Sequence, residues 1–147
     1  MAGLFKLRKA RNADLKLINA YAAAEGMDEI KSIKDIRVAA NADDQCVGFL
    51  RLTRRGGVAY VNPMATYSAW RGYGIGRALI EDALRREGEL RLVSRGGSIE
   101  FYRKMGFRDA AWEDIHADVA SDCDGCPMRE ECGPLPMLMI LREGQKE

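Results

Sequence analysis

The chain has 147 residues, of which 47% are hydrophobic and 31% charged, and its formal net charge is +1. This length suits a single domain over residues 1–147 with a core of its own. The near-neutral charge argues against a nucleic-acid partner. The sequence has no apolar run of roughly 20 residues, which argues against a membrane partner, and no signal-peptide pattern follows Met1. Together these features favour a cytoplasmic protein.

The first half of the chain predicts a strand, a helix and an antiparallel meander. Phe5 and Leu7 alternate with charged residues, which is typical of a short half-buried strand. Asn12 or Asp14 can cap the helix that follows, and the polar segment Gly26–Lys34 has room for a second short helix. Three strands joined by turns are then expected at Ile36–Ala40, Val47–Thr53 and Val58–Thr66.

The second half predicts a strand–helix–strand unit followed by a further helix and further strands. Gly106 is the residue type that most often closes a helix, and a cysteine-bearing loop is expected at His116–Pro134. The order indicates a mixed α/β (α+β) fold, with antiparallel hairpins first and a βαβ unit after them. The expected elements are helices from about Gly74 to Arg86 and at Gly97–Met105, and strands at Glu89–Ser94, Phe107–Glu113 and Leu135–Leu141.

A glycine-rich turn, Arg71-Gly72-Tyr73-Gly74-Ile75-Gly76, stands between the third meander strand and the next helix. The first N–H groups of a helix lack partners within the helix, and the helix dipole adds partial positive charge there. Glycines let a ligand approach the backbone, so the turn predicts an anion site, flanked by Arg71 and Arg77. It fits neither the dinucleotide fingerprint, because position 77 is arginine, nor the P-loop, because no G-K-S/T follows.

The turn resembles the cofactor motif Q/R-x-x-G-x-G/A of the GCN5-related N-acetyltransferases, the GNAT family. Upstream, Met64-Ala65-Thr66 stands where the strand of that family splays and pairs with the pantetheine arm, and Pro63 is compatible with such a break. Downstream, Phe101–Phe107 is similar to the family's fY.k.GF segment. The resemblance covers roughly Phe5–Asp109. It implies a mixed, mostly antiparallel sheet that is splayed at the cofactor cleft and flanked by helices.

By this resemblance, the protein is an N-acetyltransferase that passes an acetyl group from acetyl-CoA to a primary amine by direct attack. Tyr102 aligns with the tyrosine that protonates the leaving thiolate in many members, a task that suits a phenol because its ordinary pKa of about 10 keeps it protonated. The backbone of residues 64–66 would polarise the thioester carbonyl. The implied cofactor-binding residues are Met64, Ala65, Thr66, Arg71, Gly72, Tyr73, Gly74, Ile75, Gly76 and Arg77.

No general base follows from the sequence. Some members carry a glutamate on the strand before the glycine turn, but Val58–Asn62 includes no carboxylate. The alternatives are an ordered chain of waters or a side chain from another element, namely Glu25, Asp28, Glu100 or the lone histidine, His116.

The loop near the C-terminus contains three of the four cysteines, Cys123, Cys126 and Cys132. In a cytoplasmic protein such residues are more often thiols or metal ligands than disulfides. The C-x2-C spacing lets two thiolates reach one tetrahedral zinc, and the third cysteine can join them; reduced thiols or an oxidisable pair are the other interpretations. The candidates for a fourth ligand are His116, Asp122, Cys46, water and a residue of another subunit.

Two functions fit these features. The first is the acetyl-CoA-dependent N-acetyltransferase, acting on a small-molecule or peptide amine, with a homodimer left open because dimers are common in the family. The alternative is a non-catalytic acyl-CoA-binding sensor whose cysteine loop responds to metal or redox state, which the missing strand glutamate favours. A small zinc module that binds nucleic acid is the weakest interpretation, given the near-neutral charge and the single cysteine cluster.

Overall fold

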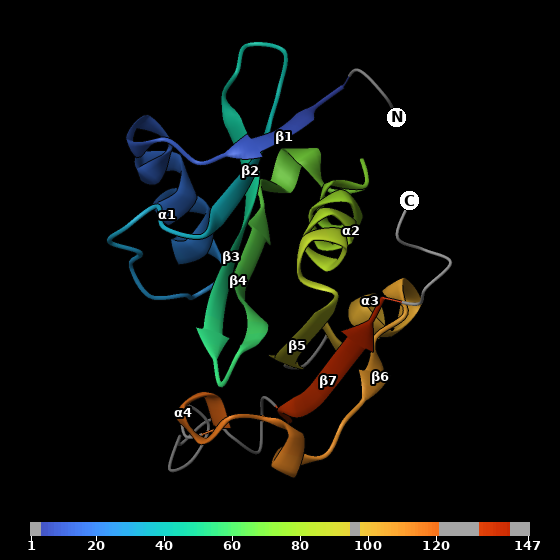
Figure 1. Cartoon of the computed structure of the whole chain (residues 1–147). Helices are drawn as coiled ribbons and strands as arrows, with labels where there is room; N and C mark the ends of the chain where they lie inside the picture. The colour runs from blue at the N-terminus through green and yellow to red at the C-terminus, as the bar shows by residue number, and fades with distance from the viewer. Residues whose placement is uncertain (1–3, 95–97, 121–132, 142–147) are drawn as a thin grey trace. The chain divides into compact units, whose positions relative to one another are not determined.

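The computed structural model describes residues 4–94, 98–120 and 133–141 (Figure 1). Its contacts divide the chain into two compact units. The first unit comprises Met1–Thr53 and Val61–Ala83, and the second comprises Arg54–Tyr60 and Leu84–Glu147.

In the described residues, seven strands form one sheet in the order β1-β2-β3-β4-β5-β7-β6. The strands are β1 (Lys6–Lys9), β2 (Ile36–Ala40), β3 (Cys46–Arg55), β4 (Val58–Thr66), β5 (Glu89–Ser94), β6 (Arg108–Asp109) and β7 (Leu135–Ile140). Pairing is antiparallel for β1–β2, β2–β3, β5–β7 and β6–β7. It is parallel for β4–β5, where Ala59 lies opposite Leu90 and Tyr60 opposite Arg91, as a βαβ unit requires.

The helices of the same residues are α1 (Leu15–Ala24), α2 (Ile75–Glu87), α3 (Ser98–Met105) and α4 (Ala117–Ala120). With the mostly antiparallel sheet, they confirm the predicted mixed α/β class. The splay at the cofactor cleft stays a prediction. None of the helices in the described part of the chain is long and apolar enough to cross a membrane.

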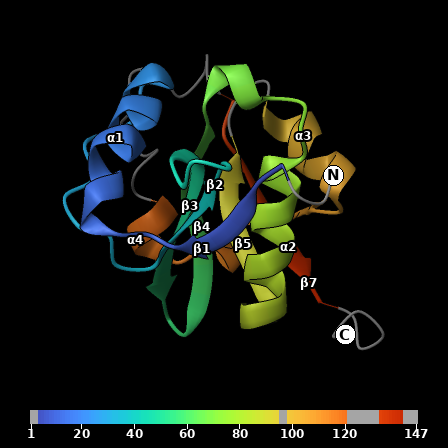
Figure 2. The same cartoon turned by 90° about the horizontal axis from the view of Figure 1, so that it is seen from above.

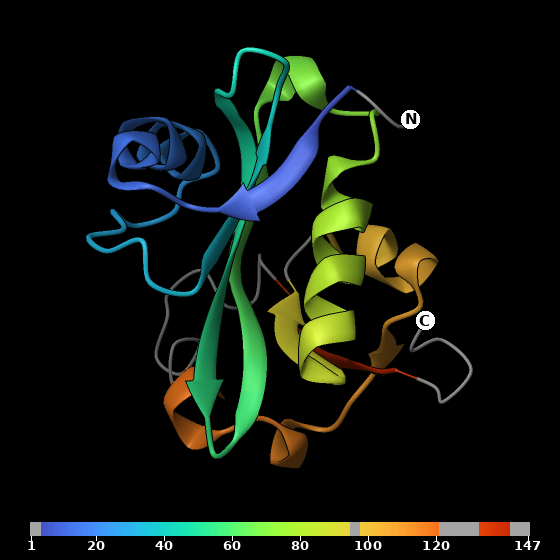
Figure 3. The same cartoon turned by 45° about the horizontal axis from the view of Figure 1, so that its top comes forward.

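In the first unit, α1 packs against one face of β2 and β3. Figures 2 and 3 show α1 on one side of these strands and the start of α2 on the other. Burying a side chain the size of Ile18 or Phe49 contributes about 1.5–3 kcal/mol, so this apolar cluster anchors α1 on the sheet. Its buried members are Ile18, Ala22, Ile30, Ile36, Val38, Cys46, Phe49 and Ala65.

The segment between α1 and β2 forms no helix, contrary to the prediction for Gly26–Lys34. The side chain of Asn19 on α1 pairs with the backbone of Ile30 instead. Its Nδ2 donates to the Ile30 carbonyl at 2.9 Å, and its Oδ1 accepts from the Ile30 N–H at 2.7 Å. This bridge and the burial of Ile30 hold the segment in an irregular path, because side-chain bonds to the backbone compete with helix formation.

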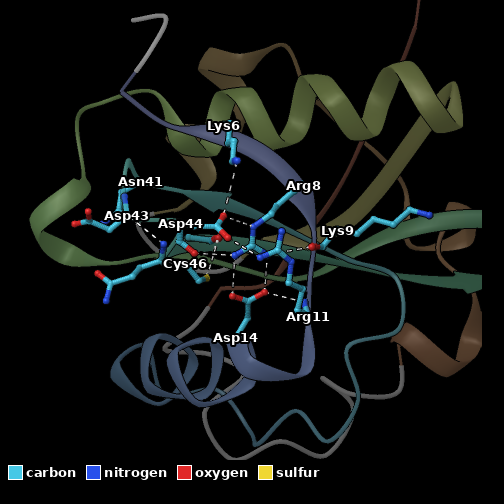
Figure 4. Close-up of polar contacts among 11 residues, drawn as sticks. Lys6, Arg8, Lys9, Arg11, Asp14, Asn41, Asp43, Asp44 and Cys46 are labelled. Carbon is cyan, nitrogen blue, oxygen red and sulfur yellow. Dashed lines mark hydrogen bonds and ion pairs between the residues drawn. The ribbon is translucent and has the colours of Figure 1, made fainter.

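An ion network joins β1, the turn before α1 and the turn between β2 and β3 (Figure 4). Asp14 is buried and accepts hydrogen bonds from Arg8 Nη1 at 2.7 Å, Arg8 Nη2 at 3.0 Å and the Arg11 N–H at 2.7 Å. Arg8 Nε and Arg11 Nη1 also donate to Asp44, at 2.9 and 2.5 Å. Burial raises the pKa of Asp14, but the bonds from Arg8 and Arg11 outweigh burial and leave the pKa below its usual range. Asp14 therefore closes this network rather than capping α1.

In the second unit, β5, β7 and β6 lie side by side (Figure 1). β6 comprises only Arg108 and Asp109, so it is shorter than the predicted strand Phe107–Glu113. Asp114 Oδ2 accepts from the Ala111 N–H at 3.1 Å and closes a 3-10 turn there. A local side-chain bond thus ends the strand, which the alternation of residue types did not reveal.

Candidate cofactor and active site

The backbone of the glycine turn between β4 and α2 is the first feature of the site. Within the described residues, nothing accepts from the N–H groups of residues 72–77, and the first helical bond runs from Ala78 N–H to the Gly74 carbonyl at 3.0 Å. Gly72 and Gly74 have φ angles of 88° and 81°, which other residues rarely adopt, and a Cβ at either would meet nothing within 4 Å. The turn therefore needs glycine for its conformation, and its donors are open to an anion.

A glycine that sequence reasoning missed, Gly48 on β3, lets the start of α2 approach the sheet. A Cβ on Gly48 would lie 2.8 Å from Ile75 Cγ2 and 3.4 Å from both the Ala65 carbonyl oxygen and Thr66 Oγ1. Ile75 is the first residue of α2 and is buried. Gly48 thus leaves room for the start of α2 and the end of β4 to lie close to β3. Its signal was a glycine inside a strand, which marks close approach.

The two arginines that flank the turn differ in their contacts. Arg71 forms an ion pair with Glu25, the residue after α1, and the side chains are 59% and 37% exposed. Arg77 is exposed and has no polar partner in the described part of the chain. Arg71 is thus neutralised by a carboxylate, whereas the charge of Arg77 is open to a ligand.

Residues 64–66, the segment expected to contact the pantetheine arm, form the end of β4. Ala65 is buried in the apolar cluster under α1, and its two neighbours are half-buried. The peptide bond before Pro63 is cis. On the neighbouring strand, Arg51 Nε donates to the Asn62 carbonyl at 2.7 Å. A guanidinium is therefore fixed beside the residues that precede this segment.

Tyr102 lies on α3, in the second unit, between two aromatic rings. Its ring centroid is 5.2 Å from that of Phe101 and 5.4 Å from that of Phe107, and both contacts are edge-on. Burial raises the pKa of Tyr102 to about 12, so the phenol keeps its proton across the neutral range. α3 ends at Gly106 as predicted, with φ of 112°, and the Phe107 N–H donates to the Tyr102 carbonyl at 3.1 Å. Tyr102 thus combines an aromatic packing role with a protonated hydroxyl.

The family of the chain follows from its central region. Residues 34–109, just over half of the chain, match the family described as "Acetyltransferase (GNAT) domain". The chain belongs to the GNAT acetyltransferase family. The matched region contains β2 to β5, the glycine turn, α2 and α3, so it confirms the resemblance drawn from the turn and from Phe101–Phe107.

Known proteins agree with this GNAT assignment. An uncharacterized N-acetyltransferase of Chlorobaculum tepidum, CT2212, is 29% identical over 87 residues, which are 57% of this chain and 56% of that protein, so the chain spans about half the length of this relative. Rv2747 of Mycobacterium tuberculosis, solved in complex with CoA, has a TM-score of 0.75 at 18% identity, covering 93% of this chain and 99% of that one. Ard1 of Thermoplasma volcanium has a TM-score of 0.70 at 19% identity, covering 95% and 99%. At these identities the solved structures establish a shared fold.

Three of the four side chains considered as general bases in this GNAT protein are engaged. Glu25 and Glu100 each pair with an arginine. His116 Nδ1 accepts from the Asp118 N–H at 3.1 Å, so this ring nitrogen is already occupied by a backbone donor. Asp28 is exposed and has no polar partner among the described residues. The contacts therefore argue against His116 as the base.

The proposed metal ligands Cys123, Cys126 and Cys132 lie outside the described residues. Among residues 4–94, 98–120 and 133–141, no group of three or more His, Cys, Asp or Glu side chains could hold a metal ion. Cys46, one candidate for the fourth ligand, is buried, and its Sγ donates to the Gly48 carbonyl at 3.4 Å. Burial raises the pKa of Cys46 to about 12, which disfavours the thiolate that a metal needs. Zinc therefore gains no support from the described residues.

Proposed function

We propose that this protein is an acetyl-CoA-dependent N-acetyltransferase that acts on a primary amine. Membership of the GNAT family supports an enzyme over the acyl-CoA sensor that the sequence also allowed. One observation carries the proposal: the N–H groups of residues 72–77, at the start of α2, have no acceptor in the part of the chain that the structure describes. They stand where the family motif binds its cofactor.

The glycine turn binds the pyrophosphate of acetyl-CoA in this proposal. Hydrogen bonds from backbone N–H groups to an anion are charge-assisted, and the dipole of α2 favours negative charge at the same place. Arg77 adds a positive charge that no described side chain neutralises. Arg71 contributes only if it exchanges Glu25 for a phosphate oxygen.

The end of β4 holds the pantetheine arm and the thioester. The backbone of Met64, Ala65 and Thr66 pairs with the arm, and a donor there polarises the acetyl carbonyl, whose oxygen gains charge as the amine attacks. The amine nitrogen bonds to the carbonyl carbon, and the carbon–sulfur bond breaks with its electron pair left on sulfur. Tyr102 gives its phenolic proton to the departing thiolate and recovers one from solvent.

The acceptor gives its own proton to water in this proposal. His116 Nδ1 already accepts a backbone hydrogen bond, and the carboxylates of Glu25 and Glu100 are paired. Asp28 is the one candidate side chain without a polar partner among the described residues, and it is the alternative to water. A water route predicts a rate that rises with pH until the acceptor amine is itself deprotonated. The corresponding measurement is the pH dependence of kcat/KM for two acceptors of different amine pKa, whose profiles should shift with the amine.

The remaining expectations from the sequence stay part of the proposal. They are a small-molecule or peptide acceptor, a homodimer, a cytoplasmic location and a zinc ion at Cys123, Cys126 and Cys132. The zinc is tested by metal analysis of freshly purified protein and of a Cys123→Ser, Cys126→Ser variant. Equal metal content in the two proteins would rule out this site.

A matched pair of glycine substitutions tests the cofactor turn. Gly74 and Gly88 lie at opposite ends of α2, have φ angles of 81° and 83°, and would place a Cβ in open space. Alanine at either position should cost about 1–2 kcal/mol of stability from the left-handed backbone. Only Gly74→Ala should also weaken acetyl-CoA binding in calorimetry, because it places a methyl group where the pyrophosphate approaches. Equal affinities for the two variants would contradict the assignment of the turn.

A further inference from the structure

Arg51 is a charged residue at the border of the apolar cluster under α1. It lies on β3 opposite Ile36 of β2, and Phe49 stands two residues before it on the same strand. Both of these apolar residues belong to the cluster. Because side chains along a strand alternate between faces, Arg51 points to the face that carries Ile36 and Phe49. Ala65, at the end of β4, belongs to the same cluster, so Arg51 and the segment expected to hold the thioester border one face.

Arg51 is a half-buried residue, and no carboxylate of the described residues balances its charge. Two other half-buried arginines are balanced: Arg8 pairs with Asp14 at 2.7 Å, and Arg91 pairs with Glu89 at 2.6 Å. Arg37 on β2 is half-buried as well and, like Arg51, has no acidic partner among the described residues, but it lies on the other face of the sheet. Arg51 pairs with no acidic side chain in the described part of the chain. Burial accordingly lowers the pKa of Arg51, with no neighbouring charge to offset it. A positive charge in this position gains most from an anion that arrives with a ligand.

The hydrogen bond from Arg51 to β4 uses only Nε, so the edge of the guanidinium formed by the two terminal nitrogens remains available to a ligand. Nε donates to the Asn62 carbonyl at 2.7 Å, which fixes the plane of the guanidinium beside β4. No buried side-chain nitrogen or oxygen among the described residues lacks a hydrogen-bond partner. The terminal nitrogens of Arg51, which make no other bond to described residues, therefore reach solvent. Two parallel N–H groups on that edge match the two oxygens of a carboxylate.

We propose that Arg51 binds a carboxylate of the acceptor, so that the acceptor class is the free amino acids. This inference rests on the proposed function, because it takes the end of β4 as the segment that holds the thioester. Asn62, the residue to which Arg51 is anchored, lies two positions before Met64, and a strand advances about 3.3 Å per residue. A carboxylate on Arg51 would thus bring an amine a few bonds away toward the thioester. Arg51 is then a specificity-determining residue.

The test compares each common L-amino acid with its own carboxamide as acceptor, scored by coenzyme A release. The pair keeps the amine and the side chain and removes only the α-carboxylate. The best acceptor should be a free amino acid, and its amide should lose about 10- to 100-fold in kcat/KM, the effect of one charge-assisted hydrogen-bonded contact. In Arg51→Gln the ratio of acid to amide should fall toward one while the KM for acetyl-CoA changes less than about twofold. Arg51→Lys should keep part of the preference.

Arg37→Gln is the matched control, because Arg37 lies on the adjacent strand β2 opposite Leu50 and so points to the other face. It removes the same charge and should leave the ratio of acid to amide unchanged. Acetylation of amines without a carboxylate at higher kcat/KM than any amino acid, or an unchanged ratio in Arg51→Gln, would overturn the inference and leave the proposed function intact. If Arg51→Gln does not fold, the wild-type ratio and Arg51→Lys decide. Failure of the wild type to bind acetyl-CoA overturns the proposed function, and this inference with it.

Discussion

Replacing Glu25 by glutamine should tighten the binding of acetyl-CoA, although Glu25 is not expected to contact the cofactor. Arg71 pairs with Glu25, so it can reach the pyrophosphate only by leaving that carboxylate. With side chains 59% and 37% exposed, the pair belongs to the class of surface ion pairs that contribute about 0.2–1 kcal/mol. Since about 1.4 kcal/mol corresponds to a tenfold change, Glu25→Gln should raise the affinity about 1.4- to 5-fold.

Calorimetry at constant ionic strength measures this change, and a charge-matched control isolates its cause. Asp28→Asn removes one negative charge three residues away, from an exposed side chain with no polar partner among the described residues. Both variants relieve general repulsion of an anionic cofactor, but only Glu25→Gln releases Arg71. In an Arg71→Gln background, Glu25→Gln should therefore have no further effect. An equal gain in acetyl-CoA affinity in Asp28→Asn would refute the competition between Glu25 and the pyrophosphate for Arg71. A full gain in affinity from Glu25→Gln in the Arg71→Gln background would refute it as well.

Three further substitutions test the fold and the chemistry. Asp14→Asn should cost about 2–4 kcal/mol in urea unfolding, because it removes the buried carboxylate that pairs with Arg8 and leaves that charge only the more exposed Asp44. The pKa of Asp14 is lower in the folded protein than in the unfolded chain. The free energy that Asp14 contributes to folding should therefore be fully present above the ordinary carboxyl pKa of about 3.9, and it should be lost as the pH falls through the pKa of the folded state. A wild type whose stability is no more acid-sensitive than that of Asp14→Asn would contradict this. Tyr102→Phe should lower kcat about 100-fold or more at an unchanged KM for acetyl-CoA, and the wild-type rate should show no loss from ionisation of this phenol until the pH approaches 12; an unchanged kcat would exclude the acid role. Gly48→Ala should destabilise the protein by about 1–3 kcal/mol through contact with Ile75, and Ile75→Leu, which lacks the Cγ2 methyl, should restore part of the loss; strict additivity of the two changes in melting temperature would rule out this contact.

The parts of the fold that follow from local patterns were predictable. The strand Val58–Thr66 has the predicted bounds, and α3 ends at Met105, just before Gly106, as expected, because a β-prone run between turn residues and a helix-closing glycine are local signals. The irregular segment after α1 was not predictable, since the bond between Asn19 and Ile30 depends on the folded path of the chain. Such contacts carry no periodic signal.

The candidate site divides in the same way. The glycine turn was identified from its own residues, because backbone conformation and helix polarity are written into a short segment. Gly48, the partner of Arg71 and the uncompensated charge of Arg51 were not identified. Glu25 lies 46 positions before Arg71, and Arg51 meets Asn62 across neighbouring strands, so only the folded structure brings them together.

Acetyl transfer itself is the central claim, and its most direct measurement is coenzyme A release from acetyl-CoA over a panel of amines, with the acetylated product quantified in the same samples. The account predicts thiol release that requires both the protein and an amine, with one acetylated amine for each coenzyme A formed. The account would be contradicted if acetyl-CoA did not bind to the protein. It would also be contradicted if, for every amine tested, the protein released thiol no faster than a control without protein.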